Sequence, residues 1–175
     1  MRDSVLLSIG AAVGIAMQLA LAPAIAIMGV MPNFVLVFVA SAALLRPSDA
    51  VMAAGFFAGM AFDLAASGTP GVMAALLTLV AFCASRAAMR LGSDTLSVSL
   101  LICMVCSLLV EVCYALFYVA DAGVPLGDAM LMRALPCALY DCGICLIILP
   151  ALSAAFSARG SSMHAAAQST TIRLR

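Results

Sequence analysis

Three acidic side chains within apolar segments are the residues of this chain best placed to do chemistry. Asp63 lies in the run from Gly55 to Gly71, and Glu111 and Asp141 lie in two later apolar runs. A carboxylate inside a hydrocarbon layer must face protein or water, and by default it marks a functional site. Three interpretations stay open: hydrogen bonds between helices, contact with another membrane protein, or a proton or ion pathway. No His, Lys or Arg accompanies the acids, which makes a relay the poorest of the three.

The segment around Asp63 has the pattern of a helix-packing face. Gly55, Gly59 and Asp63 are spaced by four, so on a helix they share one side. Glycines at this spacing let another helix approach closely in lipid. A Gly-Thr-Pro-Gly turn that ends at Gly71 then closes the run. The pattern predicts a packing surface that contains an acid.

The seven cysteines allow a second kind of chemistry. Two CxxC pairs occur, Cys103 with Cys106 and Cys142 with Cys145. A thiol becomes reactive near a positive charge or a helix start, whereas both pairs lie inside apolar runs. Structural cysteines are therefore the preferred interpretation. Signatures of hydrolases, nucleotide-binding loops and zinc sites are missing, so we expect no enzyme activity, no cofactor and no metal.

Composition decides the class of protein. Of the 175 residues, 66% are hydrophobic and 9% are charged, with a mean hydropathy of +1.24. Soluble domains are typically about 45–50% apolar, so a soluble fold has no surface for this chain. The formal net charge is zero, which gives no support to nucleic-acid binding. The chain is expected to be an all-α integral membrane protein embedded in a lipid bilayer.

Apolar runs separated by turn residues predict six transmembrane helices in one domain, residues 1–156. The expected helices span 5–22, 34–45, 50–66, 72–88, 96–120 and 135–156. The second is so short that neighbours should shelter it. In the fifth, Ser99, Cys103, Ser107 and Glu111 recur every four residues, which predicts a protein-facing side. Residues 129–133 are expected to form a short interfacial turn.

Arginine positions predict the orientation. Six crossings with a cytoplasmic N-terminus place seven of the eight arginines inside, because only Arg133 falls outside. Both termini should therefore be cytoplasmic. Residues 157–175 are polar and rich in small side chains, which predicts a flexible cytoplasmic tail.

The stretch from Pro32 to Arg86 resembles a known family. Pro32-Asn33 opens an apolar helix, a short turn follows, and then comes Gly55-Phe56-x-x-Gly59-x-x-x-Asp63-Leu64 with Gly71 eight residues after Asp63. This order and spacing resemble MreD, the rod shape-determining membrane proteins of bacteria. Glu111 in the fifth helix and Asp141 in the last helix are similar to it as well.

The resemblance implies a non-enzymatic scaffold of the cell-wall elongation machinery in the bacterial inner membrane. Family members associate with the bitopic protein MreC, and through it couple MreB filaments to the polymerase RodA and its class B penicillin-binding protein. It also implies a fold like that of energy-coupling transporter substrate-binding subunits. If Asp63 and its glycines form the groove that faces MreC, Asp63→Leu should lose co-purification with MreC. The candidate partner-binding or helix-packing residues are Pro32, Asn33, Gly55, Gly59, Asp63, Gly71, Glu111 and Asp141.

Two alternatives have different signatures. A substrate-binding subunit of an energy-coupling vitamin transporter should line an outward pocket with polar and aromatic groups, yet this chain has no Trp. A membrane thiol oxidoreductase would use Cys142 and Cys145. In that case, maleimide labelling of this cysteine pair should differ before and after reduction.

Overall fold

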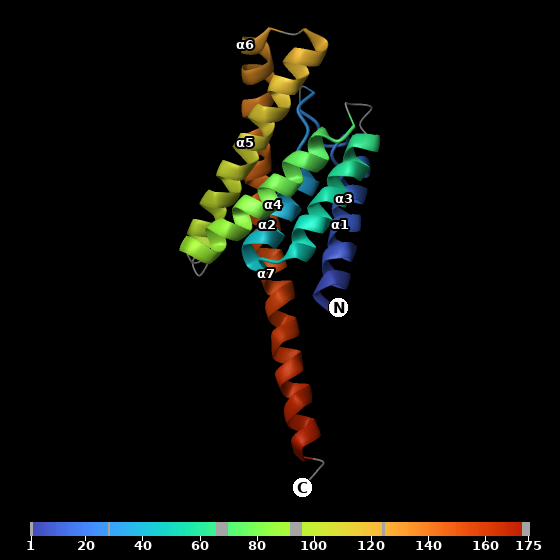
Figure 1. Ribbon diagram of the computed structural model, residues 1–175, viewed down its shortest axis with the longest axis vertical. Coiled ribbons are helices and arrows are strands. Elements are labelled where there is room, and N and C mark those ends of the chain that lie inside the picture. Colours follow the sequence, from blue (N-terminus) through green and yellow to red (C-terminus); the bar gives the residue numbers. More distant parts are fainter. Residues whose placement is uncertain (1, 28, 66–69, 92–95, 124, 173–175) are drawn as a thin grey trace.

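The chain folds into a bundle of helices (Figure 1), seen here in a computed structural model that describes residues 2–27, 29–65, 70–91, 96–123 and 125–172. The described residues form no strands, only an isolated bridge between Ile27 and Val30, which confirms the all-α prediction. The elements are α1 (Arg2–Ala20), α2 (Phe34–Leu45), α3 (Asp49–Ala65), α4 (Val72–Leu91), α5 (Leu96–Ala122), α6 (Leu126–Ala129), a π-helix (Met130–Ala134) and α7 (Leu135–Ile172).

Helix α2 is the centre of the bundle. Every residue from Phe34 to Leu44 is buried, and α2 contacts each of the five other long helices, α1, α3, α4, α5 and α7. A helix that is hydrophobic on all sides belongs in a core, and this one has no polar face except Ser41. Its 12 residues rise only about 18 Å at 1.5 Å each. The expected shelter by neighbours is confirmed.

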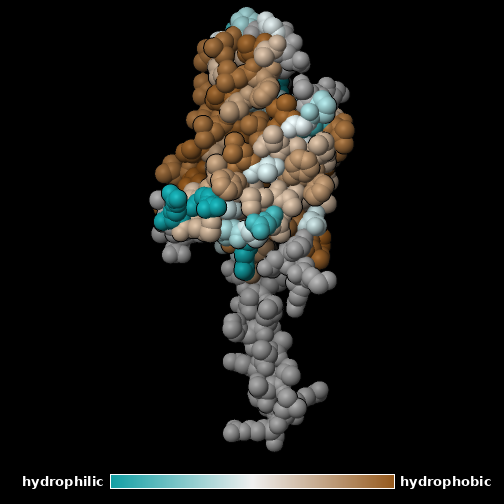
Figure 2. All heavy atoms as spheres, viewed as in Figure 1, coloured by the Kyte–Doolittle hydropathy of each residue, from teal (hydrophilic) through white to brown (hydrophobic). Residues whose placement is uncertain are grey.

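The outside of the bundle is apolar. Figure 2 shows hydrophobic side chains over most of the visible bundle, with hydrophilic ones gathered toward the lower end of the bundle. Three segments are long and apolar enough to cross a membrane, 72–90, 96–117 and 126–156, and two shorter apolar helices accompany them. Large side chains such as Phe57, Leu79 and Leu139 are more than half exposed. An exposed apolar surface of this extent is unfavourable in water, so the fold is that of a membrane protein.

Two expectations about the last third of the chain differ from the structure. Residues 126–172 form one continuous rod, interrupted only by the π-helix, and not an interfacial turn followed by a separate helix. Ala129 and Ala134 pack with Ala115 of α5, and this small cluster holds the start of the rod against α5. Helix α7 then continues past Phe156 to Ile172, away from the bundle (Figure 1). The alanine-rich composition favours this extension, whereas the flexibility of the tail stays a prediction.

Candidate functional site

The first turn of α2 lies inside the bundle, where side chains replace its missing hydrogen-bond partners. Asn33 caps the helix, because its side-chain oxygen accepts a hydrogen bond from the Leu36 N–H at 3.1 Å. Asp141 of α7 accepts from the Asn33 N–H through Oδ1 at 2.6 Å. The first N–H groups of a helix have no partner within it, and negative charge is favoured there. Asp141 therefore ties α7 to the start of α2.

Gln18 of α1 completes this helix start, and sequence analysis missed it. Its Oε1 accepts from the Phe34 N–H at 2.8 Å, and its Nε2 donates to the Pro32 carbonyl at 3.1 Å. Gln18 shares the α2-facing side of α1 with Leu7, Ala11 and Gly14, at the spacing of a buried stripe.

The signal that could have found it was an amide on the packing face of an otherwise apolar run.

Glu111 joins the same cluster from α5. It is buried, lies beside the Asn33 side chain, and is attracted by the charge of Arg133. The Arg133 guanidinium lies 5.5 Å from the centre of the Tyr114 ring. The expectation that the acids lack a nearby cation is therefore wrong for Glu111. The cation is nearby because the continuous helical rod of residues 126–172 places Arg133 against α5.

Asp63 has the same kind of role at the start of α4. Its two carboxylate oxygens accept from three backbone N–H groups, those of Gly71 at 2.9 Å and of Met73 and Ala74 at 3.2 Å each. Gly71 has a φ of +98°, which favours glycine, and so turns the chain to aim these groups at the acid. The Asp63 carboxyl group is thus bound by a helix start within its own chain.

The glycine face of α3 packs against α4 of the same chain. A Cβ added to Gly59 would lie 2.7 Å from the Met73 carbonyl oxygen, and one at Gly55 would lie 3.1 Å from the Leu77 oxygen. The sequence interpretation of a packing face with an acid is right, but its use as an MreC groove has no geometry to support it. Because the turn between the two helices is short, α4 itself occupies the close-approach surface.

The eight candidate residues thus form two internal clusters. Seven are buried and Gly71 is half-buried, so none lies on the outer surface. All three acids are buried within the chain itself. Helix starts inside the bundle donate hydrogen bonds to the two aspartates. The two clusters are Pro32, Asn33, Glu111 and Asp141 at α2, and Gly55, Gly59, Asp63 and Gly71 at α4.

The polar stripe of α5 faces protein as predicted, because Ser99, Cys103, Ser107 and Glu111 are all buried. Cys103 adjoins Cys145 of α7, and its sulfur lies 4.0 Å from the Ser41 Oγ of α2. The structure therefore brings together one cysteine from each CxxC pair. Among the described residues, no group of three or more His, Cys, Asp or Glu side chains could hold a metal ion.

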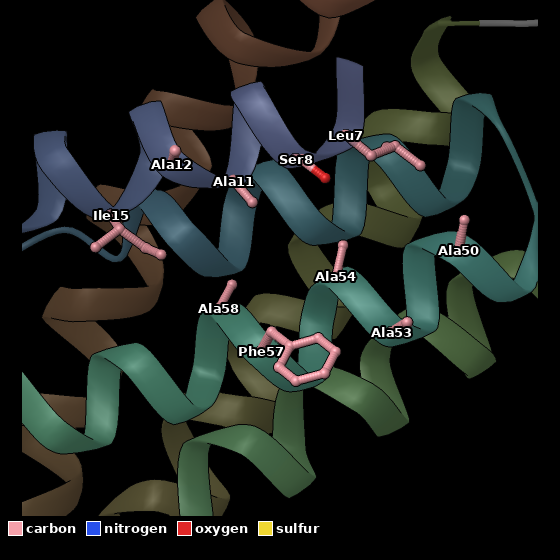
Figure 3. A pocket seen from close by; sticks show the side chains of 10 residues that line it. All are labelled: Leu7, Ser8, Ala11, Ala12, Ile15, Ala50, Ala53, Ala54, Phe57 and Ala58. Carbon is pink, nitrogen blue, oxygen red and sulfur yellow. The ribbon is translucent and has the colours of Figure 1, made fainter. Parts of the chain in front are cut away.

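Three cavities between described residues are mainly apolar, and none of the three is lined by a candidate residue of the two clusters. The groove between α1 and α3 has a volume of about 510 Å³ (Figure 3). A second, of about 500 Å³, lies between Ile27, Val30 and the start of α7, and a third of about 80 Å³ separates α4 from α5. Tyr140 and Ser8 are the main polar groups that line them.

Comparison with known families decides what this arrangement belongs to. The profile of the family described as rod shape-determining protein MreD matches residues 2–152, which include both acid clusters. The chain belongs to the MreD family. No curated protein and no solved structure matches the chain.

Membership of the MreD family assigns a role in determining cell shape as part of the rod complex. The helical fold with its apolar exterior agrees with a membrane-embedded MreD protein. Within it, the family-like residues from Pro32 to Gly71 build the starts of α2 and α4. These residues shape the bundle that any partner would meet.

Proposed function

We propose that this protein is a non-enzymatic scaffold of the rod complex in the bacterial inner membrane. In this role it binds MreC and helps couple MreB filaments to peptidoglycan synthesis by RodA and its class B penicillin-binding protein. The family match over residues 2–152 is the observation that carries the proposal. The bundle accounts for nearly all of this matched length. The acids within it bind helix starts, which leaves the outer helix surfaces for partners.

The groove between α1 and α3 is the surface proposed for MreC. Ser8 and small residues line it from both helices, and the exposed ring of Phe57 forms one side (Figure 3). Small residues allow close contact between helix backbones in lipid, where packing drives association. A single transmembrane helix of the bitopic MreC fits a groove with two helical walls. The other lining residues are Leu7, Ala11, Ala12, Ile15, Ala50, Ala53, Ala54 and Ala58.

Co-purification from membranes tests both parts of this proposal. Tagged wild-type protein should recover MreC, whereas Ala54→Leu should reduce recovery about tenfold, the effect of roughly 1.4 kcal/mol of lost packing. Ala75→Leu is the matched control, because Ala75 is exposed on α4 and lies outside every described cavity. Failure of the wild-type protein to recover MreC would refute the scaffold proposal. Normal recovery with Ala54→Leu would refute the groove alone.

A further inference from the structure

Asp141 differs from the other buried aspartate in how its oxygens are satisfied. Both residues are almost fully enclosed, Asp141 with 0% and Asp63 with 3% of its surface exposed. Both oxygens of Asp63 accept N–H groups, three in all. Asp141 has one donor, the Asn33 N–H at Oδ1, while its Oδ2 has no hydrogen-bond partner among the described residues. Three donors suit an anion, and one donor does not.

The surrounding charges point the same way. Glu111 of α5 is the charged side chain that acts on Asp141, and on its own helix Asp141 meets Cys137 and Cys145. From α2 it meets only the Asn33 backbone. Arg133 acts electrostatically on Glu111. This cation favours a charged carboxylate at Glu111.

An ionised Asp141 would place negative charge on an enclosed oxygen that has no donor. Burial of an isolated charge costs far more than burial of a neutral polar group, and such a group neutralises instead. A second negative charge beside Glu111 would add repulsion. A neutral carboxyl removes both costs and keeps the bond from Asn33, because its carbonyl oxygen can still accept an N–H.

We propose that Asp141 binds a proton at Oδ2 in the folded protein, while Glu111 keeps its charge. The contact between α2, α5 and α7 is then a proton-binding site within the membrane-embedded core. The bound proton lets Glu111 pair with Arg133 without a competing charge. It also lets α7 hold the start of α2 through a neutral group. This assignment goes beyond the scaffold role and does not depend on it.

Two asparagine substitutions in the purified full-length chain test the proposal. Asn is a neutral isostere of a protonated Asp, so Asp141→Asn should melt within about 2 °C of the wild type. Asp63→Asn is the matched control. It should melt several degrees lower, because an amide nitrogen cannot accept the backbone N–H groups that a carboxylate oxygen accepts. Asp141→Leu, which removes the acceptor for Asn33, should also melt lower.

Infrared spectroscopy in lipid nanodiscs locates the proton directly. The wild type at neutral pH should show the C=O stretch of a protonated carboxyl, and Asp141→Asn should lose it. Asp63→Asn and Glu111→Gln should keep it. The proposal is overturned if the wild type lacks this band, if the band survives in Asp141→Asn, or if Glu111→Gln removes it. Equal destabilisation by Asp141→Asn and Asp63→Asn would overturn it as well.

Discussion

The buried aspartates of this protein lie at helix starts because the first backbone N–H groups of a helix have no acceptor within the helix. Asp63 meets the first turn of α4, and Asp141 meets the residue that caps α2. Each acid accepts hydrogen bonds from backbone N–H groups that would bind water at the start of a solvent-exposed helix. In a bundle core, side chains must take over that task. The two aspartates are thus buried because α2 and α4 begin inside the bundle.

The amide of Gln18 gives a prediction at the same scale. Gln18→Leu should lower the free energy of unfolding, because it leaves the Phe34 N–H and the Pro32 carbonyl without their partner. Each unsatisfied buried group costs about 1–3 kcal/mol. Denaturant titration of the protein in detergent measures the loss. Leu19→Ala, an exposed neighbour on α1, serves as the control and should be nearly neutral. Equal stability of the two variants would show that Gln18 is dispensable.

Packing of α3 on α4 is the decisive contact at the scale of elements. Gly59 lets the two backbones approach, and one turn later Asp63 reaches the first turn of α4. The glycine spacing in the sequence predicts a close helix neighbour but cannot say which one. The neighbour is the next helix of the same chain, because the short turn at Gly71 returns it directly along α3. A hairpin of this kind leaves the glycine face unavailable to partners.

Two glycine substitutions separate packing from backbone freedom. Gly59→Ala should destabilise the protein by about 1–3 kcal/mol or more, because the new methyl group meets the backbone of α4, which cannot move aside as a side chain would. Gly143→Ala adds the same methyl group to α7, where nothing lies within 4 Å of it. It should leave stability unchanged or raise it by about 0.5–1 kcal/mol. Thermal unfolding in detergent compares them, and a harmless Gly59→Ala would contradict the close α3–α4 contact.

At the scale of the whole molecule, the described helices α1, α3, α4, α5 and α7 pack around the short α2. Helix α2 contacts these five helices, so its apolar side chains form the core, and the visible outer face of the bundle is largely apolar (Figure 2). Arg46 follows the end of α2, and Arg86 and Arg90 lie near the end of α4, so they gather at one end of the bundle. Arg133 lies near the opposite end, at the start of the long rod. This distribution supports a cytoplasmic position for both termini.

Labelling from one side of the membrane tests that orientation. Ser48→Cys lies in the exposed connection between α2 and α3, and Gly123→Cys lies in the exposed connection after α5, at the other end. An impermeant maleimide added to intact spheroplasts should label Gly123→Cys at once and Ser48→Cys only after permeabilisation. The wild type, whose native cysteines are mostly buried or half-buried, measures background. The reverse pattern would place the termini outside.

The sequence by itself determined the class of protein, the six long helices, the protein-facing side of α5 and the family, because hydropathy and residue spacing act locally along the chain. It also showed which acids would be buried. Only the tertiary structure decided what they bind: Asp63 meets α4, Asp141 meets α2, and Glu111 lies near Arg133. It also added Gln18, whose partners lie 14 and 16 residues further along the chain. Pairing of this kind depends on how helices are arranged in space, and spacing within one helix does not encode that arrangement.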